Sequence, residues 1–346
     1  MTAATLVATR GLSVTYGGRV TAVSEVDLEV REGETLALVG ESGCGKSTLG
    51  RALLRLEESS VGSVEFAGID ISQLSRGQLR VARADMQMVF QDPMGSLNPR
   101  RRIGDIVAEP LRQTRGVAKK EALRRAAELL DRVGLGSATS DRRPHEFSGG
   151  QRQRIGIARA LASRPRFIVA DEPVSALDVS VQAQVINLLA DLTREEHLTM
   201  LFISHDLGVV RHVAHRVAVM YLGQIVEIAD RDAFFARPEH PYSEALLSAV
   251  PTLAAPEDGP ARERIVLEGE LPDPASPPPG CRFSTRCPFA TDLCRTVQPK
   301  LRQVADGRQV RCHFPSSTPE GRADAVVRTL PDVPADDSLV NQKETA

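Results

Sequence analysis

The sequence lacks the features that would place it in three common classes of protein. It has no run of about 18 apolar residues, the length that a transmembrane helix needs. Its 43 basic and 45 acidic residues give a net charge of −2, without the positive excess typical of nucleic-acid-binding proteins. Its first residues, MTAATLVATRGLSVTYGG, lack the charged start and apolar stretch of a secretory signal peptide. We therefore expect a cytoplasmic chain with no transmembrane segment and no nucleic-acid partner.

Cysteine is also scarce, and its distribution is uneven. Of the five cysteines in 346 residues, three lie in the stretch CRFSTRCPFATDLC at 281–294, and Cys312 follows. Stable disulfides are rare in the cytoplasm, because glutathione keeps thiols reduced. The remaining interpretations are a zinc site, an iron–sulfur site, or buried thiols without a ligand.

Short apolar runs alternate with amphipathic segments through much of the chain. The runs at 35–40, 166–171 and 199–206 are typical of buried parallel strands, and 180–196 has the spacing of a helix. Its expected buried side is Val185, Leu188, Leu189 and Leu192. The alternation predicts an α/β fold whose ligands bind at the carboxyl ends of the strands.

Two other regions have a different composition. Residues 119–135 are typical of a helix with arginines on its outer side. Its expected buried side is Leu123, Ala126, Ala127, Leu130 and Val133. Residues 216–230 split at Gly223 into a predicted hairpin, and proline becomes frequent after residue 235. The predicted division is a core of 1–91 and 160–235, a helical subdomain of 92–159, a C-terminal extension of 236–330 and a disordered tail of 331–346.

The stretch GESGCGKST at 40–48 fits the phosphate-binding pattern G-x-x-x-x-G-K-[ST] between a predicted strand and a predicted helix. Glycines allow the backbone N–H groups to surround a phosphate, and the helix start adds a positive dipole end. We expect Lys46 to neutralise the β- and γ-phosphates and the Ser47 hydroxyl to ligate Mg²⁺. The expected nucleotide-binding residues of this loop are Gly40, Glu41, Ser42, Gly43, Cys44, Gly45, Lys46, Ser47 and Thr48.

The stretch FIVADEP at 167–173 ends an apolar strand with two adjacent carboxylates. Asp171 is expected to help hold Mg²⁺, and Glu172 to orient the water that attacks the γ-phosphate. An acidic pair in isolation is usually part of a solvated loop. The phosphate loop earlier in the chain favours the catalytic interpretation.

The stretch FSGGQRQRIGIARAL at 147–161 predicts a second anion-binding helix start, formed by Ser148, Gly149, Gly150 and Gln151. A simple helix cap would explain Ser148 but not the two glycines and the glutamine together. One active centre does not need two phosphate sites, so this segment is expected to serve a nucleotide held by another subunit.

The order and spacing of these motifs, with DEPVSALD at 171–178 and ISHD at 203–206, resemble those of the ATP-binding subunits of ABC transporters. The resemblance covers residues 5–235. It implies a P-loop NTPase fold of the ABC ATPase type, with an antiparallel β subdomain. By the same resemblance, Tyr16 would stack on adenine, and Gln91 would sense Mg²⁺ and the membrane partner. Asp178 would lie in the loop that crosses the dimer interface, and His205 would contact the γ-phosphate.

Three further stretches, at 90–111, 240–251 and 277–288, resemble the oligopeptide and dipeptide importers and their nickel and glutathione relatives. SLNPR followed by EPL resembles the second of the two ATPase subunits in such systems. The resemblance implies ATP and Mg²⁺ as cofactors and a place at the cytoplasmic face of the membrane. It implies as partners a second ATPase subunit in a head-to-tail dimer, two permease subunits and a solute-binding protein. The alternatives are a soluble ABC ATPase acting on ribosomes or DNA, and a redox-sensing regulator.

Cys44 lies in the phosphate loop, which leaves Cys281, Cys287, Cys294 and Cys312 as one set. Their gaps of five, six and seventeen residues are wider than those of zinc knuckles, whereas iron–sulfur sites accept more varied spacing. Some peptide importers carry a [4Fe–4S] cluster on a similar element, so the resemblance favours a cluster. Its expected role is structural or redox-regulatory, because the element lies outside every motif expected to touch ATP.

Overall fold

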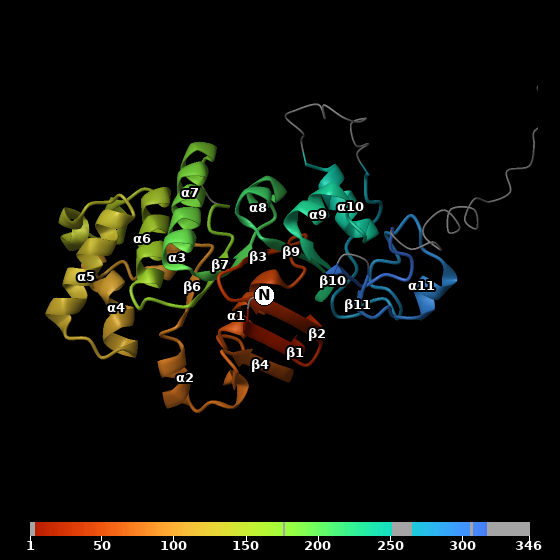
Figure 1. Ribbon diagram of the computed structural model, residues 1–346, viewed down its shortest axis with the longest axis horizontal. Coiled ribbons are helices and arrows are strands. Elements are labelled where there is room, and N and C mark those ends of the chain that lie inside the picture. The colour runs from red at the N-terminus through yellow and green to blue at the C-terminus, as the bar shows by residue number, and fades with distance from the viewer. Residues whose placement is uncertain (1–3, 176, 251–264, 305–306, 317–346) are drawn as a thin grey trace, which may run out of the picture.

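The computed structural model describes residues 4–175, 177–250, 265–304 and 307–316. Two sheets occupy the middle of the molecule, in the orders β11-β12-β10-β9-β3-β8-β7-β6 and β2-β1-β4-β5. Helices α4, α5 and α6 lie at one end and the C-terminal segments at the other, as Figure 1 shows. No helix in the described ranges is long and apolar enough to cross a membrane.

The centre of the larger sheet is parallel and fully covered. Its strands β3, β7 and β8 are buried at every residue, which confirms the strands predicted from their apolar runs. The five parallel strands are β9 (Arg216–Tyr221), β3 (Thr35–Val39), β8 (Thr199–Ile203), β7 (Phe167–Asp171) and β6 (Met86–Val89). The predicted hairpin is present, because β10 (Gln224–Asp230) pairs antiparallel with β9 and Gly223 turns between them with φ 81°.

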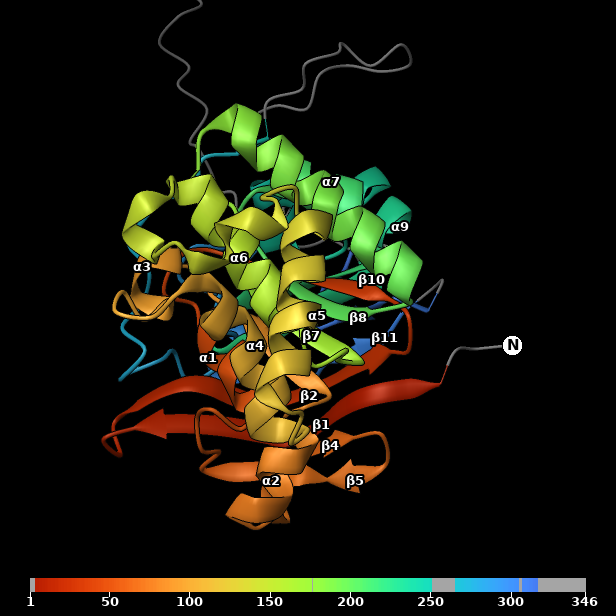
Figure 2. The same ribbon diagram turned by 90° about the vertical axis from the view of Figure 1, so that its left-hand side faces the viewer.

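The smaller sheet is antiparallel and contains β1 (Thr5–Tyr16), β2 (Val20–Arg31), β4 (Val61–Phe66) and β5 (Ile69–Asp70). Along β2, residues alternate between buried and exposed from Val26 to Arg31, as expected of a sheet with one covered face. That face shares a core with the larger sheet and with helix α1 (Lys46–Leu53). In Figure 2 this sheet lies below the helices, close to α2 (Arg76–Ala82).

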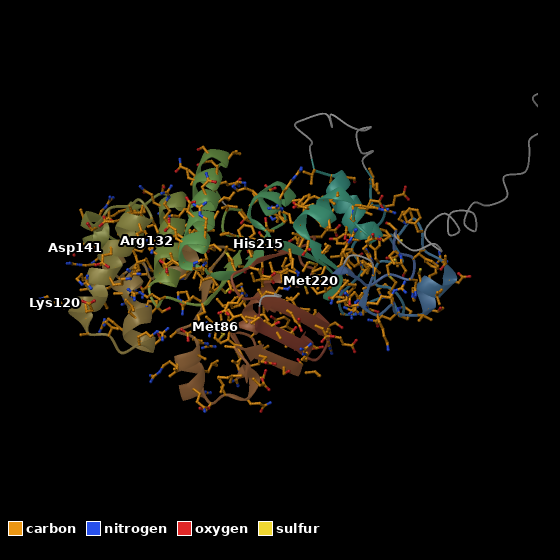
Figure 3. All side chains as sticks on the ribbon, viewed as in Figure 1. Met86, Lys120, Arg132, Asp141, His215 and Met220 are labelled. Carbon is orange, nitrogen blue, oxygen red and sulfur yellow. The ribbon has the colours of Figure 1, made fainter. Side chains whose placement is uncertain are left out.

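The helical region contains α3 (Pro93–Ser96), α4 (Ile103–Thr114), α5 (Lys119–Arg132) and α6 (Gly149–Leu161), with short 3₁₀ turns at 137–141 and 144–146. A further 3₁₀ turn at 71–73 follows β5 of the smaller sheet. Lys120 and Asp141 mark the far end of the helical region in Figure 3. Helix α5 buries Ala122, Ala126, Leu129 and Leu130, whereas Leu123 and Ala127 are only partly buried. The predicted helix is therefore correct, but its buried side is rotated relative to the prediction.

Helix α7 (Val179–Glu196) connects β7 to β8, and α8 (Leu207–Val213) follows β8. Three of the four residues expected on the buried side of α7 are buried, whereas Leu188 is only partly so. After the hairpin come α9 (Arg231–Ala236), α10 (Pro241–Ser248), α11 (Asp292–Thr296), β11 (Arg302–Gln303) and β12 (Gln309–Val310).

The C-terminal segments are joined to the core sheet. Strand β12 pairs with β10 through Glu227↔Val310 and Ile228↔Gln309. The buried carboxylate of Glu227 accepts backbone N–H bonds from Glu239 (2.8 Å) and His240 (2.9 Å) at the start of α10. Burial raises the pKa of Glu227. The tail predicted at 331–346 lies outside the described residues.

Candidate nucleotide site

The carboxyl ends of four parallel strands carry the residues that the motifs singled out. The phosphate loop follows β3, Gln91 follows β6, Asp171 ends β7 with Glu172 directly after it, and His205 follows β8. Because these strands are parallel and adjacent in the order β3-β8-β7-β6, their ends meet at one edge of the sheet.

The phosphate loop is held close to the backbone of neighbouring segments. A Cβ atom at Gly40 would clash with the carbonyl oxygen of Met220, which Figure 3 places near the middle of the molecule, and one at Gly45 would clash with that of Ala22. Gly45 also has φ 107°, which favours glycine. Lys46 is buried, and its Nζ donates to the carbonyl oxygens of Gly40 and Glu41, both at 2.9 Å. The ammonium group therefore lies inside the loop that would surround a phosphate.

Asp171 and Ser47 meet beside this loop. The Ser47 hydroxyl donates to Asp171 Oδ1 at 2.7 Å, and Asp171 is only 1% exposed. Its second oxygen, Oδ2, is buried without a hydrogen-bond partner. Burial raises the pKa of the Asp171 carboxyl. A hydroxyl beside an unpartnered carboxylate oxygen provides the hard oxygen ligands that Mg²⁺ prefers, so these residues fit the expected metal.

Glu172 is the meeting point of two other predicted residues. Gln91 Nε2 donates to Glu172 Oε2 at 2.9 Å, and His205 Nδ1 lies 3.3 Å from Glu172 Oε1. Glu172 has φ 43°, which is unusual for a residue with a side chain, and its N–H donates to the Ile203 carbonyl at 3.0 Å. The carboxylate is 14% exposed and His205 60% exposed. A water reaching this carboxylate could be polarised for attack on a phosphate.

Tyr16 also lies beside the phosphate loop. Its side chain is at the end of β1, is 41% exposed, and its hydroxyl donates to Thr48 Oγ1 at 3.5 Å. Ser42 and Gly43 are exposed on the loop itself, whereas Cys44 is buried beneath it. An exposed aromatic ring next to a phosphate loop is suited to stacking on a base.

The helix start at Ser148 has the geometry of a cap. Ser148 Oγ accepts the Gln151 N–H at 3.4 Å, and Gln151 Oε1 accepts the Ser148 N–H at 3.0 Å. Ser148, Gly149 and Gln151 are exposed. Gly150 is buried, and a Cβ there would clash with Val181 at the start of α7.

Asp178 caps that neighbouring helix. It accepts the Val181 N–H at 3.0 Å and the Ser180 hydroxyl at 2.8 Å, and the bond from Val181 lowers its pKa. In the described part of the chain, the side chains of Ser148 and Asp178 bond only within the starts of their own helices. The structure therefore brings these two predicted residues to adjacent helix starts and leaves both exposed.

The four cysteines beyond residue 280 line a single cavity of about 10 Å³, which is about the space of one water. All are free thiols, and burial raises the pKa of Cys281 to about 11 and of Cys287 to about 12. Within the described ranges, no group of three or more His, Cys, Asp or Glu side chains could hold a metal ion. The thiols thus provide the donors of a metal site without the space for one, and the predicted [4Fe–4S] cluster has no support in this arrangement.

The cysteine element lies outside the ATP motifs in sequence, but the structure brings it into contact with one of them. Arg286 lies between Cys281 and Cys287, and its Nη1 donates to Oε2 of Glu41 in the phosphate loop at 2.8 Å. Tyr242, from the C-terminal extension, accepts the backbone N–H of Glu41 at 2.9 Å. These partners are separated by 245 and 201 residues in the chain. Sequence motifs gave no signal for either contact, because neither is part of a local pattern.

Comparison with known proteins agrees with this geometry. Residues 23–175 match the ABC transporter family, and residues 226–294 match the oligopeptide/dipeptide transporter C-terminal region. The chain resembles a dimeric ATP-binding cassette, MJ0796, solved with ADP and phosphate after hydrolysis. The TM-score is 0.60 and the identity 31%, over 65% of this chain and 99% of that one.

Two curated relatives are more similar in sequence. A probable peptide ABC transporter ATP-binding protein, y4tS of Sinorhizobium fredii, is 54% identical over 85% of this chain and 82% of its own length. The oligopeptide transport ATP-binding protein AppF of Bacillus subtilis is 53% identical over 86% of this chain and 90% of its own length. With relatives of this identity and coverage, and with the phosphate loop, Asp171 and Glu172 gathered at one sheet edge, the chain belongs to the ATP-hydrolysing, ATP-binding subunits of ABC transporters.

Proposed function

We propose that this chain hydrolyses ATP to drive the import of dipeptides or oligopeptides through an ABC transporter at the cytoplasmic face of a membrane. The observation that carries the proposal is the joining of a catalytic constellation around Glu172 to an oligopeptide/dipeptide transporter C-terminal region in one chain. The functions in the names of y4tS and AppF support the same cargo class.

The proposed roles follow from the geometry of the site. Lys46, buried within the loop, neutralises the β- and γ-phosphates, and Tyr16 stacks on the base. Ser47 and Asp171 hold Mg²⁺, which would neutralise charge on the phosphates when bound. Glu172 orients the attacking water, while Gln91 and His205 fix its carboxylate from two sides.

The second half of the composite site is proposed to come from another ATPase subunit. The exposed start of α6 at Ser148–Gln151 has backbone N–H groups and a positive dipole end suited to a phosphate. Asp178 is exposed next to it, at the start of α7. In a head-to-tail dimer, each subunit would offer this surface to the nucleotide of its partner, and a heterodimer with the second ATPase of the system is the proposed form.

A groove beside Gln91 is proposed to receive a cytoplasmic segment of a permease subunit. It has a volume of about 230 Å³ and is lined by Met86 (labelled in Figure 3) and Met88 of β6 and by Phe90, which follows the strand. Its polar lining residues are Arg83, Gln87 and Arg159. Leu54 and Leu56 line another side, and Leu56 is 44% exposed. Phe90 lines the groove, and the next residue, Gln91, donates a hydrogen bond to the catalytic carboxylate of Glu172. A permease segment bound in the groove would therefore lie close to that hydrogen bond.

We also propose that the four C-terminal cysteines hold a [4Fe–4S] cluster. The basis of this proposal is the sequence, which groups Cys281, Cys287, Cys294 and Cys312 in an element resembling that of cluster-carrying peptide importers, whereas the cavity that the thiols share has no space for a metal ion. A cluster is larger than a single ion, so the thiols would have to move outward and lose their protons to bind it.

The test of the proposed function is transport by the reconstituted complex. The chain is assembled in proteoliposomes with its second ATPase, its two permeases and its solute-binding protein, and uptake of a labelled dipeptide, Ni²⁺ and glutathione is compared. Peptide uptake that requires internal ATP and disappears with Glu172→Gln is the expected result. Uptake of Ni²⁺ or glutathione alone would assign the related importer class, and a chain that does not join the permeases would contradict transport.

A further inference from the structure

The cysteine loop, residues 281–287, reaches the phosphate loop through a largely buried ion pair. The Arg286 side chain is 9% exposed and that of Glu41 29% exposed, with 2.8 Å between Nη1 and Oε2. Glu41 is fixed at its backbone too. Its N–H donates to Tyr242 Oη at 2.9 Å, and its carbonyl accepts from Lys46 Nζ at 2.9 Å. Two distant parts of the chain, together with Lys46 of the loop itself, therefore hold Glu41.

Aromatic packing fixes the segment from which Arg286 reaches. Phe283 lies three residues earlier in the cysteine loop and is 1% exposed. Its ring meets Tyr221 edge-on, with centroids 5.2 Å apart, and lies 5.4 Å from the ring of Tyr242. Tyr221 directly follows Met220, whose carbonyl excludes a side chain at Gly40. Phe283 and Tyr242 are thus packed on the strand that supports the phosphate loop.

A second arginine of the cysteine loop supports the far side of the phosphate loop. Arg282 donates to the Leu222 carbonyl and to Ser24 Oγ, the latter at 2.8 Å. Gly223, which follows Leu222, donates its N–H to the Cys44 carbonyl at 2.8 Å. The cysteine loop therefore contacts Glu41 directly and Cys44 through the turn between β9 and β10.

We propose that Arg286 is a positioning residue for ATP binding and acts through Glu41. A carboxylate on a loop that surrounds phosphates repels them unless its charge is neutralised, and Arg286 is its ion-pair partner. The same contact fixes the backbone of the loop before nucleotide arrives, which lowers the ordering cost of binding. Both effects increase the affinity for ATP. Both depend on the nucleotide site alone, independently of the transported substrate.

The test measures the affinity of the full-length chain for a fluorescent ATP analogue with Mg²⁺. Arg286→Gln is expected to raise Kd by about 10-fold, because it leaves the Glu41 carboxylate without its charged partner. Arg295→Gln is the matched control. Arg295 belongs to the same C-terminal element, is 62% exposed and pairs with Asp292 instead. The control is expected to bind as wild type, and an Arg286→Gln variant that also does so overturns the proposal.

A cycle with Glu41 distinguishes this role from general support of the fold. In a Glu41→Gln background there is no carboxylate charge to neutralise, so adding Arg286→Gln is expected to change Kd by less than about two-fold. An equal loss of affinity in both backgrounds would show that Arg286 does not act through Glu41, and would overturn the proposal.

Steady-state kinetics supply a second readout in case Arg286→Gln does not fold. Arg286→Lys keeps the positive charge that neutralises Glu41, so KM for ATP is expected to stay within about two-fold of wild type, with kcat at saturating ATP unchanged. A KM raised about 10-fold despite the retained charge, or a reduced kcat at unchanged KM, assigns Arg286 a structural role and overturns the proposal. These measurements do not involve transport, so their failure leaves the proposed peptide import intact.

Discussion

Gln91 donates a hydrogen bond of 2.9 Å to Glu172, and thereby joins the loop after β6 to the carboxylate at the end of β7. The groove proposed for a permease lies directly before Gln91 on β6. A movement of the groove would reach the catalytic carboxylate through a single side-chain contact. We therefore assign the proposed coupling between transport and hydrolysis to the hydrogen bond between Gln91 and Glu172.

The first prediction concerns Glu172. Glu172→Gln removes the charge that orients water but keeps the side-chain volume, so hydrolysis is expected to fall by about 100-fold or more while ATP binding remains. ATP-bound dimers with the second ATPase should accumulate, as measured by size-exclusion chromatography. Glu195→Gln is the control, because Glu195 is exposed and pairs with Arg132 away from the site. Phosphate release within a few-fold of wild type would remove Glu172 from the mechanism.

The second prediction separates the two halves of the composite site. Lys46→Ala should abolish ATP binding by the isolated chain, since the loop loses its buried ammonium group. Ser148→Arg should leave that binding intact and block hydrolysis in the assembled dimer, because Ser148 serves the partner's nucleotide. Equilibrium binding and phosphate release measure the two effects. If Ser148→Arg prevents ATP binding by the isolated chain, the head-to-tail arrangement is wrong.

The third prediction uses the raised pKa of Asp171, which burial causes. The folded state then disfavours the ionised carboxyl, which lowers the free energy of unfolding. This loss of stability is absent below pH 3.8, the ordinary pKa of an aspartate, and grows as pH rises from there through the raised pKa. Asp171→Asn should therefore melt at a higher temperature than wild type near neutral pH without nucleotide, and the difference should shrink toward pH 4. For the same variant, Mg²⁺ together with ATP should raise the melting temperature no more than ATP alone does. A Mg²⁺ effect equal to wild type would exclude Asp171 as a ligand.

The fourth prediction tests the groove beside Gln91. Leu56→Glu places a charge on an apolar wall, so binding to the permeases should weaken while ATP binding by the isolated chain is unchanged. Leu293→Glu is a matched control, because Leu293 is equally exposed (45% against 44%) but lies in the C-terminal element. Co-purification of the complex measures the effect. Equal retention of both variants would place the permease contact elsewhere.

The fifth prediction concerns the four C-terminal cysteines. Protein purified without oxygen should be brown and contain about four irons per chain if the thiols hold the cluster. Cys294→Ser should lose the iron, whereas Cys44→Ser should retain it, since Cys44 lies beneath the phosphate loop. Colourless anaerobic protein, with stoichiometric zinc or without metal, would reject the cluster and leave the ATP site unaffected.

The parts of the site that sequence could predict are those encoded in short stretches. The phosphate loop and Asp171 each follow a continuous apolar run, and β3 and β7 form where those runs lie. The resemblance assigned Gln91 and His205 to the nucleotide site, but their contacts with Glu172 were not predicted. Residue spacing alone does not say which side chains touch there.

The parts that sequence missed depend on packing between distant segments. Helix α5 contacts both α4 and α6, so its buried side includes Ala122 and Leu129 rather than following the apolar spacing from Leu123. The contacts of Glu41 with Arg286 and Tyr242 join segments more than 200 residues apart. No local periodicity encodes such pairs, because each exists only when the C-terminal extension is folded against the core.

The pairing of β12 with β10 has a consequence for the order in which the protein is completed during synthesis. Until the ribosome has made residues 309–310, β10 is the edge of the sheet and its outer backbone groups have no strand partner. The strands that end at the nucleotide site all come earlier in the chain, so the catalytic edge can assemble while the C-terminal segments are still being translated. During that interval the outer edge of β10 would be open to pairing with another strand.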